Sequence, residues 1–205
     1  MSQKTTLIQE DLFRPLVILL SGPSGVGKDA VIKTMQQMEF PFHFVVTTTD
    51  RPKRKGEVDG VDYNFISPDE FQRMVRDGEF IECAKVYDHY KGVPRKQIEG
   101  ALATGKDVIL RLDVQGAARV RELFPDSVQI FLIPENEEQW ERRFRLRGTE
   151  DEELLQLRMK IAHDELCHLH DFDYLVVNAT DCLDETVRNI IAIIRAEHLR
   201  LHPLR

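Results

Sequence analysis

Cysteine is scarce in this sequence: Cys83, Cys167 and Cys182 are the only three among 205 residues, and they are far apart. A framework of disulfide bonds is therefore not expected, because domains that rely on disulfides carry many more cysteines. Long apolar runs are missing as well, since none approaches the roughly 18 residues of a membrane-spanning helix. Residues 1–14 also lack the apolar core of a secretory signal peptide. These absences predict a cytoplasmic protein that does not enter a membrane.

Positive charge is not in excess, since 28 lysines and arginines face 35 aspartates and glutamates and leave a net charge of −7. This balance argues against general binding of nucleic acid. The basic residues are nevertheless clustered at 51–55 and at 142–147, and such clusters in an acidic protein favour small anionic ligands. Apolar residues make up 42% of the chain, which is typical of a folded globular protein.

Short apolar runs alternate with helical patterns along most of the chain. This alternation predicts an α/β fold with a doubly wound parallel sheet. Strands are expected at 16–20, 42–47, 107–112, 128–133 and 174–177. Helices are expected at 30–38, 115–123, 137–147, 151–169 and 184–201. Neither an internal repeat nor a low-complexity linker interrupts the pattern, which favours one domain over residues 1–205.

Two segments depart from this alternation. Residues 48 to about 94 are rich in charge, glycine and turns, with short strands expected around 63–66 and 80–87, and they predict a lobe inserted into the core. Residues 142–158 are dense in arginine and acidic residues, which predicts an exposed helical lid. The core would then comprise residues 15–47, 95–141 and 159–201.

A glycine-rich turn follows the first expected strand. Residues 21–28 read Ser-Gly-Pro-Ser-Gly-Val-Gly-Lys, and the pattern G-x-x-x-x-G-K runs from Gly22 to Lys28. Backbone N–H groups in such a turn cradle phosphates at the start of a helix, and the lysine places a charge against the outer phosphates. The pattern therefore predicts a fold of the P-loop NTPase type that binds a nucleotide. An ordinary glycine turn, the alternative, explains neither the lysine nor the preceding strand.

Two arginines three positions apart, Arg51 and Arg54, lie in a predicted loop after the second strand. Arginine can bind a phosphate with two parallel hydrogen bonds, which lysine cannot do. The hydroxyl of Tyr63 could donate to the same phosphate. A basic run of this kind is more often only a solvated loop, but its position in a P-loop protein favours a second phosphate site.

Five segments, in this order and spacing, resemble guanylate kinase. They are Gly22–Lys28, the stretch 51–65 with the pattern Arg-x-x-Arg-x-Gly-Glu-Val-Asp-Gly-x-Asp-Tyr-x-Phe, Gly78–Glu82, Asp113–Gly116 and Arg147–Glu150. Each segment alone would be weak evidence, but the five together are specific, and the resemblance covers roughly residues 16–195. The resemblance implies a single kinase domain in which the inserted lobe binds GMP. It also implies that the γ-phosphoryl group of ATP is moved to GMP with the help of Mg²⁺.

The resemblance implies roles for individual residues as well. ATP would be bound by Gly22, Pro23, Ser24, Gly25, Val26, Gly27, Lys28, Asp29 and Asn178. GMP would be bound by Thr47, Arg51, Arg54, Glu57, Tyr63, Glu82, Lys91, Gly92 and Asp113. The catalytic residues would be Lys28, Arg143, Arg147 and Arg158, the arginines being delivered by the lid to stabilise charge on the transferred group. Asp29 would ligate Mg²⁺.

Glu82 would provide the preference for guanine. Guanine offers two adjacent donors, N1–H and N2–H₂, and one carboxylate accepts both, whereas adenine lacks this pair. Without the resemblance, Glu82 would more simply be a surface residue of a β-hairpin. In the same way, Arg143 and Arg147 could form surface ion pairs, and Asn178 could be a turn former.

Three segments differ from most guanylate kinases, at four positions in all. Asp29 replaces a serine or threonine; a carboxylate is a good Mg²⁺ ligand, but its charge should weaken metal-free nucleotide binding. Lys91 and Val93 stand where a tyrosine and a hydroxyl residue usually contact GMP. Arg111 replaces the first acid of an Asp-x-Asp pattern, which leaves Asp113 alone there. The first two differences resemble the plastid-type branch of the family.

Other interpretations stay open. The Gly-Lys-Asp ending of the loop also occurs in ribose 1,5-bisphosphate phosphokinase, which is an alternative function. Glu57, Tyr63, Glu82 and Asp113 favour a guanine nucleotide as the acceptor instead. A non-catalytic interaction module is a further alternative, but such modules typically lack the lysine and the lid arginines. His163, Cys167 and His170 share one face of an expected helix and could hold zinc, but no fourth ligand is evident. The sequence does not indicate an oligomeric state.

Overall fold

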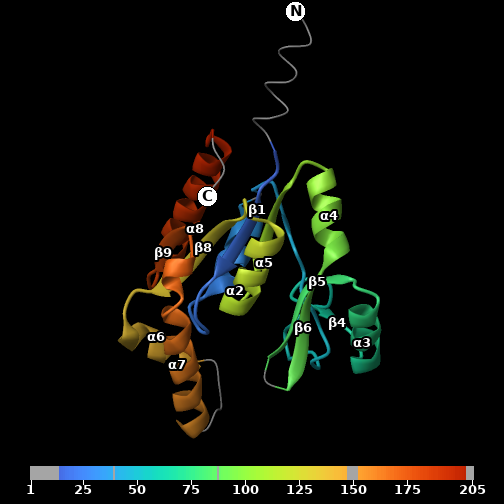
Figure 1. The fold of residues 1–205 in the computed structure, drawn as a ribbon. Helices are drawn as coiled ribbons and strands as arrows, with labels where there is room; N and C mark the ends of the chain where they lie inside the picture. Colours follow the sequence, from blue (N-terminus) through green and yellow to red (C-terminus); the bar gives the residue numbers. More distant parts are fainter. Residues whose placement is uncertain (1–13, 39, 87, 147–151, 202–205) are drawn as a thin grey trace, which may run out of the picture.

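The computed structural model describes residues 14–38, 40–86, 88–146 and 152–201. Five strands form a central sheet in the order β2-β7-β1-β8-β9 (Figure 1). They are β1 (Val17–Ser21), β2 (Phe42–Phe44), β7 (Asp107–Arg111), β8 (Val128–Pro134) and β9 (Tyr174–Asn178). Each pair of neighbours is parallel, so the five carboxyl ends lie along one edge. The predicted α/β fold with a parallel sheet is confirmed.

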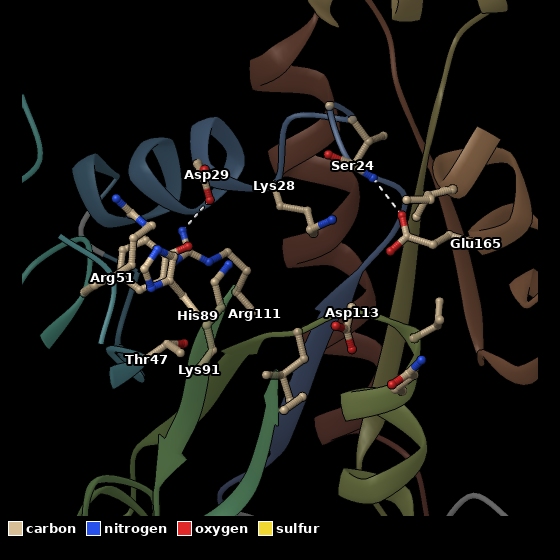
Figure 2. Close-up of a pocket in the computed structure, with 18 of the residues that line it drawn as sticks. Ser24, Lys28, Asp29, Thr47, Arg51, His89, Lys91, Arg111, Asp113 and Glu165 are labelled. Carbon is tan, nitrogen blue, oxygen red and sulfur yellow. Dashed lines mark hydrogen bonds and ion pairs between the residues drawn. The ribbon is translucent and has the colours of Figure 1, made fainter. Parts of the chain in front are cut away.

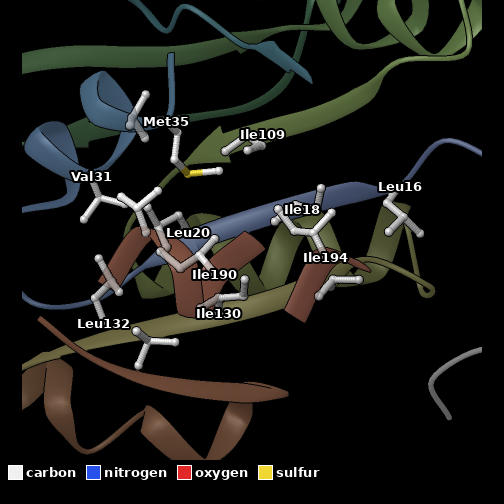
Figure 3. Close-up of a cluster of buried hydrophobic side chains, with 14 of the residues drawn as sticks. Leu16, Ile18, Leu20, Val31, Met35, Ile109, Ile130, Leu132, Ile190 and Ile194 are labelled. Carbon is white, nitrogen blue, oxygen red and sulfur yellow. The ribbon is translucent and has the colours of Figure 1, made fainter. Parts of the chain in front are cut away.

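Helices cover both faces of this sheet. They are α2 (Lys28–Gln37) and α8 (Leu183–His198) on one face, and α4 (Arg95–Ala103) and α5 (Val114–Leu123) on the other. Ile18 and Leu20 of β1 pack with α2 and α8 (Figure 3), whereas Val17 and Leu19 pack with α4 and α5. Because β1 is buried on both faces, its sequence is a continuous apolar run. Each such side chain contributes about 1.5–3 kcal/mol by its burial.

A second sheet of four strands, in the order β4-β3-β6-β5, lies beside the first (Figure 1). Its strands are β3 (Thr48–Thr49), β4 (Asn64–Phe65), β5 (Phe80–Val86) and β6 (His89–Pro94). Helix α3 (Pro68–Arg76) packs on this sheet through Phe71, whose ring stacks on that of Phe80 at a centroid distance of 4.7 Å. A separate sheet in residues 48–94 accounts for the interrupted alternation of the sequence.

The predicted strand 42–47 was wrong in its extent, because β2 ends at Phe44. The side chain of Gln97 explains this end: its Oε1 accepts from the N–H of Val46 at 2.9 Å, and its Nε2 donates to the carbonyl of Val46 at 3.0 Å. With both backbone groups of Val46 satisfied by a side chain, the chain leaves the central sheet and enters the second one at Thr48. Strand β6 was not predicted.

The helices differ from the sequence prediction in two ways. Helices α3 and α4 were not predicted, although Ser67 before Pro68 is a recognisable start signal, and its hydroxyl accepts from the N–H of Glu70 at 3.2 Å. The predicted lid, 142–158, consists of the end of α6 (Glu137–Leu146) and the first half of α7 (Glu152–Leu166), while 147–151 lie outside the described residues. None of the helices in the described ranges is long and apolar enough to cross a membrane.

Candidate active site

A cavity of about 830 Å³ opens at the carboxyl edge of the central sheet, where the second sheet faces it (Figure 2). In parallel α/β sheets this edge is where ligands bind, because the loops that follow the strands build the site. Many residues predicted from the sequence for the two substrates line this single cavity. They are Ser24, Gly25, Val26, Gly27, Lys28, Asp29, Thr47, Arg51, Arg54, Glu57, Tyr63, Glu82, Lys91 and Asp113.

The loop between β1 and α2 requires glycine at two positions. Gly22 has a φ of 137°, and a Cβ atom there would lie 2.3 Å from the carbonyl oxygen of Leu132. Gly27 has a φ of 105°, and a Cβ atom there would lie 2.5 Å from Nδ2 of Asn178. A larger residue at either position would strain the backbone and displace a buried neighbour. The conformation of the loop at the start of α2 therefore depends on these two glycines.

Lys28 is the first residue of α2, and its side chain folds back over the loop. Its Nζ donates to the carbonyl oxygens of Gly22 and Pro23, the second at 3.2 Å. Burial lowers the pKa of Lys28 to about 8, while the carboxylates of Glu165 and Asp29 act in the opposite direction. Lys28 therefore remains mostly protonated at neutral pH, and its charge can act on a phosphate held by the loop.

Ser24 is held by two residues that sequence reasoning missed. The Nε1 of Trp140, a residue 1% exposed, donates to the carbonyl of Ser24 at 2.8 Å. Glu165 of α7 accepts from the N–H of Ser24 at 2.9 Å (Figure 2). Burial raises the pKa of Glu165, although Lys28 opposes the shift. These bonds connect the phosphate loop to α6 and α7, the two helices that contribute to the predicted lid. No local sequence motif identifies Trp140 or Glu165 as a partner of this loop.

Asn178 and Arg143 lie behind the loop, and neither is among the residues that line the cavity. Asn178 is 4% exposed, and its Nδ2 donates to the carbonyl of Val26 at 2.7 Å. Arg143 donates to the same carbonyl at 3.1 Å and to the carbonyl of Asn178 at 3.0 Å. Both residues thus support the loop, and their contacts with substrate stay predictions. Arg147 lies outside the described residues, as does the side chain of Arg158 on α7.

Glu57 organises the basic loop that the sequence predicts as a second phosphate site. Its Oε1 accepts from Nη2 of Arg51 at 2.7 Å, and its Oε2 accepts from the backbone N–H of Arg54 at 2.8 Å. Burial alone would raise the pKa of Glu57, but these hydrogen bonds outweigh burial and lower it. Glu57 therefore stays ionised at neutral pH and fixes the guanidinium of Arg51 at the cavity wall.

Positive charge converges on the ring of Tyr63. Cζ of Arg51 lies 5.5 Å from the ring centroid, Nζ of Lys91 lies 5.4 Å from it, and Cζ of Arg111 lies 4.9 Å from it. Cations are attracted to the face of an aromatic ring, so the ring offsets part of their mutual repulsion. Such a concentration of positive charge suits the binding of a phosphate group. The sequence predicted three of these residues for this site and missed Arg111.

Glu82 on β5 provides a carboxylate whose pKa is well above its usual range. Burial, together with the charge of Asp113, raises the pKa of Glu82 to about 7. Asp113 precedes α5, where its Oδ1 accepts from the N–H of Gly116 at 2.9 Å. Thr47 is buried just before β3 and also lines the cavity. A partly buried carboxylate whose pKa is shifted in a cavity is typical of a functional site.

Gly92 and Val93 on β6 have packing roles. A Cβ atom at Gly92 would lie 2.7 Å from the ring of Phe80, so a side chain here would displace that ring. Val93 is 1% exposed and belongs to the core cluster that includes α4 and α5, which accounts for an apolar residue where a hydroxyl is usual. A contact between Gly92 and GMP stays a prediction.

The expected shared helix face of His163, Cys167 and His170 is wrong, because α7 ends at Leu166 and His170 lies in a separate 3₁₀ turn, Leu169–Asp171. Nδ1 of His163 lies 2.8 Å from the carbonyl oxygen of Met159, and Nε2 lies 3.1 Å from a carboxylate oxygen of Glu137. Cys167 donates to the carbonyl of His163 at 3.9 Å. Within the described ranges, no group of three or more histidines, cysteines and acidic residues is arranged to hold a metal ion. The zinc interpretation of His163, Cys167 and His170 therefore gains no support.

Comparison with known proteins agrees with the motifs. The family model "Guanylate kinase" matches residues 13–197. Guanylate kinase 2, chloroplastic/mitochondrial, of Oryza sativa subsp. japonica is 45% identical over 92% of this chain and 67% of its own length. Guanylate kinase of Caldanaerobacter subterraneus subsp. tengcongensis is 43% identical over 91% of this chain and 89% of its own. The crystal structure of guanylate kinase from Anaplasma phagocytophilum has a TM-score of 0.73 at 32% identity, covering 91% of this chain and 88% of that one. The chain belongs to the guanylate kinase family.

Proposed function

We propose that the cavity binds ATP at the loop 22–29 and GMP against the second sheet, and that the γ-phosphoryl group of ATP passes to GMP to give ADP and GDP. The observation that carries this proposal is that one cavity holds two different sets of residues on facing sides. A phosphate loop lines one side, and the Arg51–Glu57 pair with the carboxylate of Glu82 lines the other. Membership of the guanylate kinase family supports the same reaction.

The acceptor would be held at both of its ends. Arg51, Arg54, Tyr63 and Lys91 would bind the phosphate of GMP, since their charges and hydroxyl gather where Glu57 fixes the basic loop. At the other end, Glu82 would accept from N1–H and N2–H₂ of guanine. Thr47 and Asp113 line the same cavity and would complete the recognition of the base.

Transfer would be direct and in line. The attacking phosphate oxygen of GMP is already anionic, so no residue has to remove a proton, and position and positive charge are what the protein supplies. Lys28 would act on the outer phosphates of ATP. Arg143, Arg147 and Arg158 would add charge when the lid closes, for which Arg143 would exchange its bonds to Val26 and Asn178 for bonds to phosphate.

Kinases of this type use Mg²⁺, and Asp29 is the residue that would hold it. Mg²⁺ is usually bound by one or two carboxylates together with substrate phosphates. Asp29 directly follows Lys28, lines the cavity and has a side chain 60% exposed, so its position and donor chemistry fit the ion. When bound, Mg²⁺ would offset the negative charge of the phosphates.

Replacement of Asp29 by serine should make ATP binding less dependent on Mg²⁺. Without metal, the carboxylate of Asp29 repels the triphosphate, although Arg111 offsets part of its charge, and serine removes this repulsion. The ratio of the Kd for ATP without Mg²⁺ to that with Mg²⁺ should fall about tenfold, as expected for one charge near another. Calorimetric titrations of both proteins measure this ratio, and equal ratios would contradict the assignment.

Recognition of GMP should depend on pH through Glu82. Its carboxylate must be ionised to accept from guanine, and its pKa is raised to about 7 by burial and by Asp113. At saturating ATP, kcat/KM for GMP reports this ionisation, so it should fall about tenfold per pH unit below pH 7 and level off above it. A flat profile between about pH 6 and about pH 8 would rule out this role for Glu82.

A coupled assay of ADP formation tests the function itself, with GMP, dGMP, AMP, UMP and ribose 1,5-bisphosphate offered in parallel. GMP should be a far better acceptor than AMP or UMP, because only guanine presents the donor pair that Glu82 accepts. Preference for ribose 1,5-bisphosphate would favour the other small-molecule kinase. Binding of GMP without turnover of any acceptor would favour a non-catalytic module.

A location in the cytoplasm is likewise a proposal, which cell fractionation tests.

A further inference from the structure

Arg111 has no role in the reaction described above, yet it lies in the wall of the same cavity (Figure 2). It is the last residue of β7, and its side chain is only 11% exposed. A charged side chain that is so enclosed has to be paired, because its desolvation is otherwise costly. The partners of Arg111 therefore indicate what it does.

The guanidinium of Arg111 joins the two sides of the cavity. Its Nη1 forms an ion pair with the carboxylate of Asp29 in the first turn of α2 (Figure 2). Its Nη2 donates to the backbone carbonyl of Asp62 at 3.3 Å. Asp29 belongs to the side of the phosphate loop, and Asp62 precedes β4 of the second sheet. A planar group with several fixed donors can serve both partners at once, which a lysine ammonium does less well.

Arg111 also contacts an aromatic residue of the acceptor site. Its Cζ lies 4.9 Å from the ring centroid of Tyr63 and 5.7 Å from that of Phe44 at the end of β2. The attraction between cation and ring orients Tyr63, and with it the hydroxyl that would meet the phosphate of GMP. Because Nη2 holds the adjacent Asp62, both the main chain and the ring of this segment depend on Arg111.

We propose that Arg111 is a positioning residue for the acceptor phosphate site: through its ion pair with Asp29 it holds Asp62 and Tyr63 in place relative to the phosphate loop. This inference rests on the proposed function and adds a residue that need not touch GMP. It gives Asp29 a second task besides metal binding. It also links two departures from the common family pattern, since Asp29 and Arg111 form an ion pair with each other.

A direct bond from Arg111 to the phosphate of GMP is the competing explanation, and the charge of Asp29 distinguishes the two. If Asp29 fixes Arg111 in place, loss of the carboxylate leaves the guanidinium less well held and weakens GMP binding. If Arg111 binds the phosphate itself, Asp29 competes with that phosphate, and loss of the carboxylate strengthens GMP binding.

Calorimetric titrations with GMP and with guanosine, in the absence of ATP and metal ions, test the proposal. Arg111→Met should weaken GMP binding about tenfold and leave guanosine binding within about twofold, because guanosine has no phosphate to position. Asp29→Asn should weaken GMP binding about threefold or more. Arg111→Lys keeps the charge but loses the planar donors, so its affinity for GMP should lie between that of Arg111→Met and that of the wild type. The matched control is Arg119→Met, an exposed arginine of α5 that pairs with Glu122, and it should bind as the wild type does.

Each contrary result has a separate meaning. Wild-type GMP affinity in Arg111→Met overturns the inference, and tighter GMP binding in Asp29→Asn replaces it with the direct bond. Equal losses for GMP and guanosine, with a lowered Tm, would reveal a general folding defect and would also overturn it. If the wild-type protein itself fails to bind GMP, the proposed function falls, so the two failures are distinguishable.

Discussion

Replacement of Lys28 by methionine should lower kcat/KM for ATP by about a thousandfold, the upper range for loss of one group that stabilises transition-state charge. The Nζ of Lys28 lies over the phosphate loop, bonded to the carbonyls of Gly22 and Pro23. Phosphoryl transfer shifts charge onto the outer phosphates of ATP, and a fixed cation beside them lowers the barrier. Methionine fills much of the same space but supplies no charge. Steady-state kinetics at saturating GMP measure the effect.

The loss should occur without loss of stability. Burial lowers the pKa of Lys28 to about 8, which means that the folded protein holds this charged group less favourably than water does, so methionine should leave Tm equal or higher. Lys33→Met, at an exposed position of α2, is the control and should keep wild-type kinetics. Full activity of Lys28→Met would remove Lys28 from the mechanism, and a fall in Tm would assign it a structural role instead.

The parts of the fold that follow from local sequence could be predicted. The sequence of β1, the loop and α2 is contiguous, and the steric need for glycine at Gly22 and Gly27 is visible in the pattern itself. Many of the residues that line the cavity were predicted because family motifs mark them, one segment at a time. Strand β2 was overextended because its end depends on Gln97, a side chain 51 positions from Val46.

The contacts that join distant segments could not be predicted from one sequence. Arg111 and Asp29 are 82 positions apart, and Ser24 and Glu165 are 141 positions apart. A sequence shows that Arg111 replaces an expected acid, but it does not show which carboxylate that arginine reaches. For the same reason the bonds from Arg143 to the carbonyls of Val26 and Asn178 were not foreseen, and its contact with the transferred phosphate stays a prediction. Long polar side chains acquire their roles only when the fold brings their partners together.

The second large effect is expected at Glu82. Replacement by glutamine should cost about 2–4 kcal/mol in kcat/KM for GMP, which corresponds to roughly thirtyfold to a thousandfold. A carboxylate accepts from both N1–H and N2–H₂ of guanine. The amide replaces one acceptor with a donor, so one hydrogen bond is lost and two donors face each other. Because Glu82 is partly buried, water cannot fully compensate for the lost partner.

The size of this effect should itself depend on pH. The pKa of Glu82 is raised to about 7, so at lower pH the wild-type side chain is increasingly protonated and, like glutamine, presents one donor and one acceptor. The ratio of wild-type to Glu82→Gln kcat/KM for GMP should therefore be largest above about pH 8 and should shrink as pH falls toward 6, while the Kd for ATP is the same in both. Glu99→Gln, exposed on α4, should show neither change. If Glu82→Gln has the same kcat/KM for GMP as the wild type across this range, then Thr47 or Asp113 recognises the base. Replacement of one of those two residues would then have to lower kcat/KM for GMP.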